Sequence, residues 1–223
     1  MEIIDLGHKE YGETLAMQRN LFGSMVERKK SGLPVENEYL LLVEHNPVVT
    51  LGKHAKESNM LLSEEMMAQS GVEVYHIERG GDVTYHGPGQ LVMYPLIDLE
   101  AHHSGVKDYV WMLEESVIRT IAEYGVRGER VAGASGVWIG AGSDRERKIC
   151  ALGVKCSRFV TMHGLALNVN TDLRGFSLIN PCGFIDKGVT SLAAETGHEC
   201  YMEEVKRLLS GHFQDLLLKR LLF

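Results

Sequence analysis

The chain has 223 residues, of which 44% are hydrophobic and 24% are charged, a composition typical of one soluble globular domain spanning residues 1–223. Its net charge of -7 argues against general nucleic-acid binding. The N-terminus has no basic start, and no apolar run is long enough to span a membrane, so we expect a cytoplasmic protein without a signal peptide. The four cysteines have no Cys-x-x-Cys spacing, which argues against a zinc knuckle or a redox motif.

Apolar patterning in the first half of the chain predicts strands separated by two helices. A nearly continuous apolar run at residues 39–44 predicts a strand that is buried on both faces. Ser63 followed by two glutamates predicts a capped short helix that ends at Gly71. The other predicted elements are strands at residues 3–6, 48–52, 72–77 and 91–97, and a helix over residues 11–30.

The second half alternates in the same way. A helix over residues 105–125 has Tyr109, Leu113, Val117 and Ile121 on one face. Further strands are predicted at residues 136–140, 148–156, 164–170 and 178–184, and a last helix over residues 202–221. This pattern predicts an α+β, or mixed α/β, fold with neither a Rossmann arrangement nor a phosphate-binding P-loop.

The stretch from Arg79 to Gln90 reads Arg-Gly-Gly-Asp-Val-Thr-Tyr-His-Gly-Pro-Gly-Gln and lies between two predicted strands. Glycines in such a place give backbone that a ligand can approach closely, because no Cβ stands in the way. A tight hairpin with a bulge is the alternative interpretation. The hydrogen-bonding side chains of Thr84, Tyr85, His86 and Gln90 favour a binding site, since a plain turn needs none of them.

Cys182 is the cysteine in the most unusual local sequence, between Pro181 and Gly183. Proline restricts the backbone and glycine permits a sharp reversal, so this turn could present a thiol to a cavity. The predicted strand holds Cys150 and Cys156 on one side, where buried thiols are usually inert. A nucleophilic cysteine reacts as the thiolate and needs a neighbouring cation, because a free thiol has a pKa of about 8.5.

Four segments resemble the octanoyltransferases of lipoate biosynthesis. They are the Arg79–Gln90 stretch with the strand and Tyr-Pro that follow it, Lys-Ile-Cys-Ala-Leu-Gly from Lys148, Met-His-Gly-Leu-Ala-Leu-Asn-Val from Met162, and Asn-Pro-Cys-Gly around Cys182. The resemblance covers roughly residues 40 to 195. Met162 replaces a phenylalanine that is common in that family, which could alter the wall of the pocket but not the chemistry.

The resemblance implies the fold of the biotin/lipoate protein ligases, a nucleophilic Cys182 and an essential Lys148. It also implies an acyl pocket lined by residues 79–86 and by parts of two later strands. The substrate-binding set is Arg79, Gly80, Gly81, Asp82, Val83, Thr84, Tyr85, His86, Ala151, Leu152, Gly153, Gly164, Leu165 and Ala166. The donor would be octanoyl-acyl carrier protein. The acceptors would be lipoyl domains of 2-oxoacid dehydrogenase complexes and the glycine cleavage H protein, with no cofactor or metal.

Several alternatives remain open at this stage. Lys155 competes with Lys148, although it is more easily explained as a solvated lysine on a strand. His86 could act as a general base, or join His163 and a cysteine as a metal site, or order the loop by hydrogen bonds. An ATP-dependent lipoate ligase and a non-catalytic acyl-binding protein are the rival functions.

Docking of the two acidic protein partners could use a basic rim. The candidate residues of this rim are Lys53, His54, Lys56, Arg145, Arg147 and Arg158.

Overall fold

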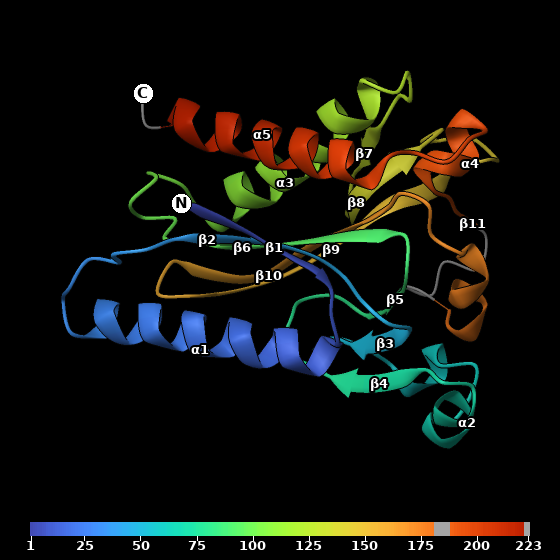
Figure 1. Ribbon diagram of the computed structural model, residues 1–223, viewed down its shortest axis with the longest axis horizontal. Helices are drawn as coiled ribbons and strands as arrows, with labels where there is room; N and C mark the ends of the chain where they lie inside the picture. Colours follow the sequence, from blue (N-terminus) through green and yellow to red (C-terminus); the bar gives the residue numbers. More distant parts are fainter. Residues whose placement is uncertain (181–187, 221–223) are drawn as a thin grey trace.

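Two β-sheets form the centre of the computed structural model, which describes residues 1–180 and 188–220 (Figure 1). The strands of the larger sheet are β1 (Glu2–His8), β2 (Tyr39–Glu44), β6 (Gln90–Leu96), β7 (Glu129–Val131), β8 (Ala134–Ile139), β9 (Arg147–Ser157), β10 (Val160–Asn168) and β11 (Gly188–Val189). Their order is β1-β2-β6-β10-β9-β8-β7, and β11 pairs with β9. The pairs β1–β2 and β9–β11 are parallel, and the other pairs are antiparallel.

The smaller sheet contains β3 (Val48–Leu51), β4 (Glu73–His76) and β5 (Val83–His86) in the order β4-β3-β5. The helices are α1 (Tyr11–Lys30), α2 (Glu64–Gln69), α3 (Val106–Ala122), α4 (Leu192–Thr196) and α5 (Met202–Arg220), with short 3-10 turns η1 (Glu57–Asn59) and η2 (Leu173–Leu178). Among the described helices, none is long and apolar enough to cross a membrane.

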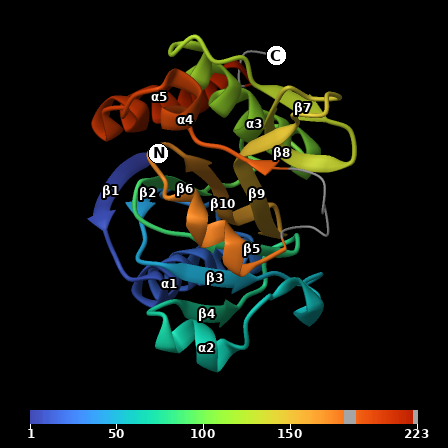
Figure 2. The ribbon, with the colours of Figure 1, turned by 90° about the vertical axis from the view of Figure 1, so that its right-hand side faces the viewer.

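Helices cover both faces of the larger sheet. Helix α1 packs on one face, and α3 and α5 lie side by side on the other (Figures 1 and 2). Strand β2 shows why both layers form: Leu40 and Leu42 join the core under α3 and α5, whereas Leu41 and Val43 join the core under α1. The prediction that this strand is buried on both faces is therefore confirmed.

Helix α3 illustrates how the sequence sets an element. Its four apolar residues Tyr109, Leu113, Val117 and Ile121 recur at helical spacing and are all 0% exposed. Each such burial stabilises the fold by roughly 1.5–3 kcal/mol relative to an exposed side chain. Gly125 ends the segment with a φ of +74°, a conformation that glycine adopts without steric cost.

The predicted strands and long helices are found close to their expected bounds, with three differences. The Arg79–Gln90 stretch is not all loop, because residues 83–86 form β5 against β3. The prediction of a strand from residue 178 was wrong over residues 178–180. Leu178 is the last residue of η2, and the Asp172 side chain caps η2 by accepting from the N–H of Arg174. Ile179 makes only an isolated bridge to Met60. Strands β7 and β11 and helix α4 were not predicted. A single catalytic domain stays a prediction.

Candidate active site

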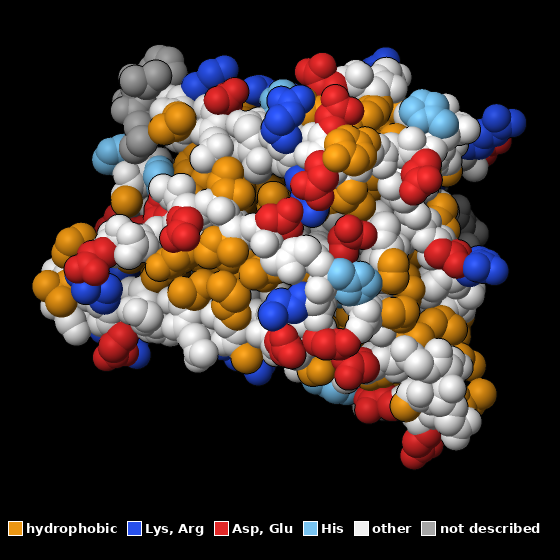
Figure 3. Space-filling model, in the orientation of Figure 1, with side chains coloured by type: hydrophobic (Ala, Val, Ile, Leu, Met, Phe, Trp, Pro, Cys, Tyr) orange, Lys and Arg blue, Asp and Glu red, His pale blue; other side chains and the backbone are white. Residues whose placement is uncertain are grey.

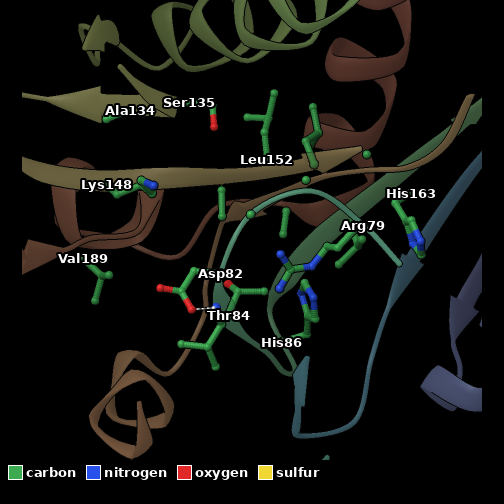
Figure 4. A pocket seen from close by; sticks show the side chains of 18 of the residues that line it. Arg79, Asp82, Thr84, His86, Ala134, Ser135, Lys148, Leu152, His163 and Val189 are labelled. Carbon is green, nitrogen blue, oxygen red and sulfur yellow. Dashed lines mark hydrogen bonds between the residues drawn. The ribbon is translucent and has the colours of Figure 1, made fainter. Parts of the chain in front are cut away.

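A cavity of about 370 Å³ lies between the two sheets (Figure 4). Its walls come from β5 and the loop before it, from strands β6, β8, β9 and β10, and from the first residue of α1. The structure thus brings together segments that are far apart in the sequence. The members of the predicted pocket that line it are Arg79, Gly81, Asp82, Val83, Thr84, His86, Ala151, Leu152, Gly153, Gly164, Leu165 and Ala166.

Two residues of the predicted set, Gly80 and Tyr85, are not among the residues that line the cavity. The Tyr85 ring packs edge-on against Phe176, with ring centroids 5.4 Å apart, and Phe176 itself lines the cavity. Gly80 donates its backbone N–H to the Val154 carbonyl at 2.9 Å, which fastens the loop to β9. Both residues therefore support the wall from behind.

Arg79 is a buried cation at the centre of the site, 7% exposed. Its Nη2 donates to the carbonyl and to the hydroxyl of Thr50 at 2.8 and 3.0 Å, and its Nη1 donates to the Gly80 carbonyl at 3.1 Å. Gly153 makes room for it, because a Cβ there would lie 2.8 Å from both Arg79 Cδ and the Gly80 carbonyl oxygen. Close approach of backbone and side chain explains the glycine at this position.

Asp82 organises one rim of the cavity. Its carboxylate accepts from Asn59 Nδ2 at 2.6 Å, from the Lys56 N–H at 3.3 Å and from the Val83 N–H at 2.8 Å. These bonds hold the segment around η1 against the start of β5. The exposed His54, which also lines the cavity, donates its backbone N–H to the Gly81 carbonyl at 3.2 Å.

His86 is buried and hydrogen-bonded. Its Nδ1 lies 2.7 Å from Gln90 Oε1, while Gln90 Nε2 donates to Asn168 Oδ1 at 2.9 Å, so the three side chains tie β5, β6 and β10 together. Burial lowers the pKa of His86 to about 3, with the neighbouring His45 adding to the effect. A neutral imidazole of such low basicity suits the ordering role better than the general-base role.

Lys148 reaches the cavity because β9 contains a bulge. Val137 pairs with Cys150, but the next residue of β8, Trp138, pairs with Lys148, which leaves Ile149 as the extra residue. Ile149 and Cys150 consequently both face the core under α3, and Lys148 lines the cavity. Without the bulge, the two-residue period of a strand would turn Lys148 toward the core beside Cys150.

The Lys148 ammonium is held over an aromatic face. Its Nζ lies 4.5 Å from the centre of the Trp138 ring, and the Trp138 Nε1–H donates to the Ala134 carbonyl at 3.0 Å. The indole is 1% exposed and provides the negative face that attracts a cation. This contact favours the charged form of the lysine.

The strand that carries Trp138 is fixed from behind by a buried carboxylate. Glu114 of α3 accepts from the Gly136 N–H and from Arg130 Nε, each at 3.0 Å. Gly136 has a φ of +123°, and a Cβ there would lie 2.5 Å from the Cys150 carbonyl oxygen, so only glycine fits this turn.

Cys182 lies outside the described residues, as do the Pro181 and Gly183 that flank it. Cys150 and Cys156 are described, and burial raises the pKa of both thiols, which makes them poor nucleophiles. Lys155 does not line the cavity: its Nζ pairs with Glu78 at 3.2 Å and lies 4.9 Å from the centre of the Phe22 ring. It is therefore packed under α1 rather than solvated, contrary to the expectation.

The basic residues proposed as a docking rim do not form one surface. Lys53, His54 and Lys56 are exposed near Asp82. Arg147 is engaged by Glu195, with its Nε donating at 2.7 Å. Arg158 follows the far end of β9, whose 11 residues extend about 33 Å at a rise of about 3.3 Å each. Acidic and basic side chains are also interspersed on the face shown in Figure 3.

Sequence reasoning missed several residues of the site. Tyr11 and Tyr94 both line the cavity, whereas the sequence predicted residue 11 only as the start of a helix. Tyr94 belonged to the Tyr-Pro pair of the motif, which was a signal that could have been used. In the described part of the chain, no group of three or more histidines, cysteines or carboxylates could hold a metal ion.

Comparison with known proteins defines the class first. Residues 10–214 match the family described as the lipoyl protein ligase A/B catalytic domain. A lipoate-protein ligase A bound with ATP superposes with a TM-score of 0.68 at 18% identity, covering 97% of this chain and 86% of that one. The biotin protein ligase of Aquifex aeolicus superposes with a TM-score of 0.52 at 15% identity, covering 98% and 70%. The predicted mixed α/β fold of the biotin/lipoate protein ligases is confirmed.

Sequence relatives then narrow the assignment. The chain is 53% identical over 210 residues to the octanoyltransferase of Bacteroides fragilis, covering 94% of this chain and 95% of that one. It is 52% identical over 213 residues to that of Parabacteroides distasonis, covering 95% and 96%. The chain therefore belongs to the octanoyltransferase family of acyl-transferring enzymes, as the sequence motifs predicted.

Proposed function

We propose that this chain takes octanoyl from a thioester on acyl carrier protein, carries it on Cys182, and passes it to the ε-amine of a lysine on a lipoyl domain. The acceptors would be the lipoyl domains of 2-oxoacid dehydrogenase complexes and the glycine cleavage H protein. The reaction needs no cofactor and no metal.

The observation that carries this proposal is the position of Lys148 at the open end of the cavity. Residues beside it, Gly133 and Ser135, are exposed, whereas Tyr11, Tyr94 and His163 at the other end are 2%, 4% and 2% exposed. An acyl chain could thus extend inward over Leu152 and Ala166 while its carbonyl remains near the lysine. Pockets of a few hundred cubic ångströms suit small ligands of this kind.

The described residues on both sides of Cys182 are held at this open end. The Asn180 N–H donates to the Asn59 carbonyl at 2.7 Å, and Asn59 binds Asp82 of the cavity rim. On the other side, Val189 pairs with Lys148 in β11 and β9 and lines the cavity.

The chemistry follows from a cysteine and a lysine in reach of one acyl carbonyl. The Cys182 thiolate, supported by the Lys148 ammonium, would attack the carrier thioester, and the C–S bond to the carrier would break. The carrier thiol would leave with a proton from that ammonium, so that Lys148 becomes neutral. The acceptor amine would then attack the new thioester and lose a proton to the neutral Lys148 amine. The Cys182 thiolate would be expelled, and the amide would remain on the acceptor.

Transfer of octanoyl to a purified lipoyl domain, with and without ATP, tests the proposal. Octanoyl-acyl carrier protein should acylate the lipoyl domain in the absence of ATP, and free octanoate should not. Transfer from free octanoate that requires ATP would instead support a ligase. Retention of octanoyl carrier protein without any transfer would support a binding protein.

A further inference from the structure

The cavity ends in polar groups, although the proposed octanoyl chain ends in a methyl group. Arg79, His86 and His163 lie on the side of the cavity away from Lys148 (Figure 4). Tyr11 and Tyr94 also line the cavity, and the Tyr11 ring lies 6.0 Å from that of His86. A pocket that recognised only saturated alkyl chains would gain nothing from such groups, because a buried polar atom is costly unless it is hydrogen-bonded.

Three of these polar side chains have partners within the protein, and those of Arg79 are the Thr50 and Gly80 atoms given above. The Tyr94 hydroxyl lies 3.0 Å from His45 Nε2, and His86 Nδ1 lies 2.7 Å from Gln90 Oε1. His163 differs from them: the residue is only 2% exposed, and its Nε2 has no hydrogen-bond partner among the described residues.

The backbone holds His163 in this place at some cost. It has a φ of +62°, in the left-handed region that non-glycine residues rarely adopt. Its N–H donates to Gln18 Oε1 of α1 at 3.2 Å, and Gln18 is 0% exposed. A strained residue with an unpaired buried nitrogen at a ligand cavity indicates a function for that nitrogen.

The imidazole is neutral at physiological pH, since burial lowers the pKa of His163 to about 3, and the nearby cations Arg79, Lys155 and Arg19 lower it further. A neutral Nε2 either donates or accepts one hydrogen bond, depending on the tautomer. A hydroxyl group can satisfy either form, because it is both a donor and an acceptor.

We propose that His163 forms a hydrogen-bonding subsite at the buried end of the cavity, which takes acyl chains that carry a hydroxyl or similar polar atom at the end remote from the carbonyl. The proposal rests on the proposed function only in assigning the cavity to an acyl chain. It extends the substrate class from octanoyl to medium-length chains with a polar terminus.

Two ligands of nearly equal size separate this subsite from an apolar pocket. 8-Hydroxyoctanoate and nonanoate differ by a terminal hydroxyl in place of a methyl group. Titration calorimetry with the full chain would give the ratio of their dissociation constants for wild type, His163→Leu and His163→Asn. Because the ratio is formed within each protein, a general loss of affinity in a variant cancels.

The expected result is a ratio about tenfold less favourable to the hydroxy acid in His163→Leu than in wild type, the equivalent of one hydrogen bond of about 1.4 kcal/mol. His163→Asn, which tolerates the left-handed backbone and keeps a hydrogen-bonding group, should lie nearer to wild type. Equal ratios in wild type and His163→Leu would overturn the subsite, as would the failure of both acids to bind.

Acylation of the enzyme is measured separately. An unchanged ratio beside normal formation of an acyl-enzyme would refute the subsite and leave the proposed function intact. A ratio that depends on His163, in a protein that never becomes acylated by octanoyl carrier protein, would support the subsite and refute the covalent mechanism.

Discussion

The Lys148 ammonium lies over the Trp138 indole, 4.5 Å from the ring centre, and the two residues are paired across β8 and β9. The two side chains share a face only because the bulge at Ile149 turns Lys148 away from the core. An aromatic face stabilises an ammonium by about 0.5–2 kcal/mol. Trp138 therefore acts on the proposed chemistry through Lys148.

Replacement of Trp138 should shift the pH dependence of acyl transfer. In Trp138→Leu the ammonium loses the aromatic face, so the alkaline limb of the acylation rate should move to lower pH. Trp138→Phe keeps an aromatic face and should shift less. Single-turnover acylation across pH measures this, and superimposable profiles in wild type and Trp138→Leu would contradict it.

Lys148 variants should separate the two proposed steps. Lys148→Met removes the cation and should slow iodoacetamide alkylation of Cys182 at neutral pH, about tenfold for each unit by which the thiol pKa rises. Lys148→Arg keeps the charge but cannot release a proton, so it should spare alkylation more than transfer to the acceptor.

Lys155→Met is the matched control for the Lys148 variants, because this lysine lies on the same strand but does not line the cavity. Its alkylation profile should follow that of wild type. Identical profiles in wild type and Lys148→Met would remove Lys148 from the reaction.

Gly153→Ala should destabilise the fold and narrow the cavity. The added Cβ would lie 2.8 Å from the Gly80 carbonyl oxygen, a backbone atom that cannot move aside cheaply. Overpacking of this kind typically costs about 1–3 kcal/mol. Gly211→Ala is the control of opposite sign: it lies within α5 with open space around it, and should stabilise by about 0.5–1 kcal/mol. Unfolding midpoints in urea that are equal for wild type and Gly153→Ala would contradict this explanation.

Stability should fall on mild acidification because three histidines are buried. Burial lowers the pKa of His45 to about 4, and those of His86 and His163 to about 3. In the unfolded chain each has a pKa of about 6.5, so only the unfolded state gains these protons between about pH 6 and pH 4. The stability that they contribute is complete above pH 6.5 and is lost as pH falls.

The slope of unfolding free energy against pH near pH 5 measures this effect, because it is proportional to the number of protons taken up on unfolding. These three histidines should together contribute about three protons to that number. His163→Asn should reduce the uptake by about one proton. His198→Asn, at an exposed position, is the matched control variant. A slope that does not respond to His163→Asn would show that this histidine is already protonated in the folded state.

The sequence predicted most of the fold because its apolar periods are clear. The continuous apolar run in β2 and the helical spacing in α3 each depend only on local pattern, and both elements were found as expected. The strand expected from residue 178 failed because a short apolar run cannot be distinguished from a 3-10 turn capped by Asp172. Whether the run forms a strand or a 3-10 turn depends on the Asp172 side chain, which lies outside the run.

The candidate site could be predicted in composition but not in geometry. The motifs named most of the residues that line the cavity, yet no periodicity shows that β9 is bulged, and strict alternation would place Lys148 with Cys150. Trp138 had no signal in the motifs, because its role arises from cross-strand pairing. The assignment of Cys182 stays a prediction.

Intact mass after mixing the enzyme with octanoyl-acyl carrier protein tests the covalent mechanism most directly. Wild type, Cys150→Ala and Cys156→Ala should each gain one octanoyl group that hydroxylamine removes, because burial raises the pKa of both of those thiols. Cys182→Ala should gain none. An octanoyl adduct that persists in Cys182→Ala would contradict the assignment of Cys182 as the residue that carries the acyl group.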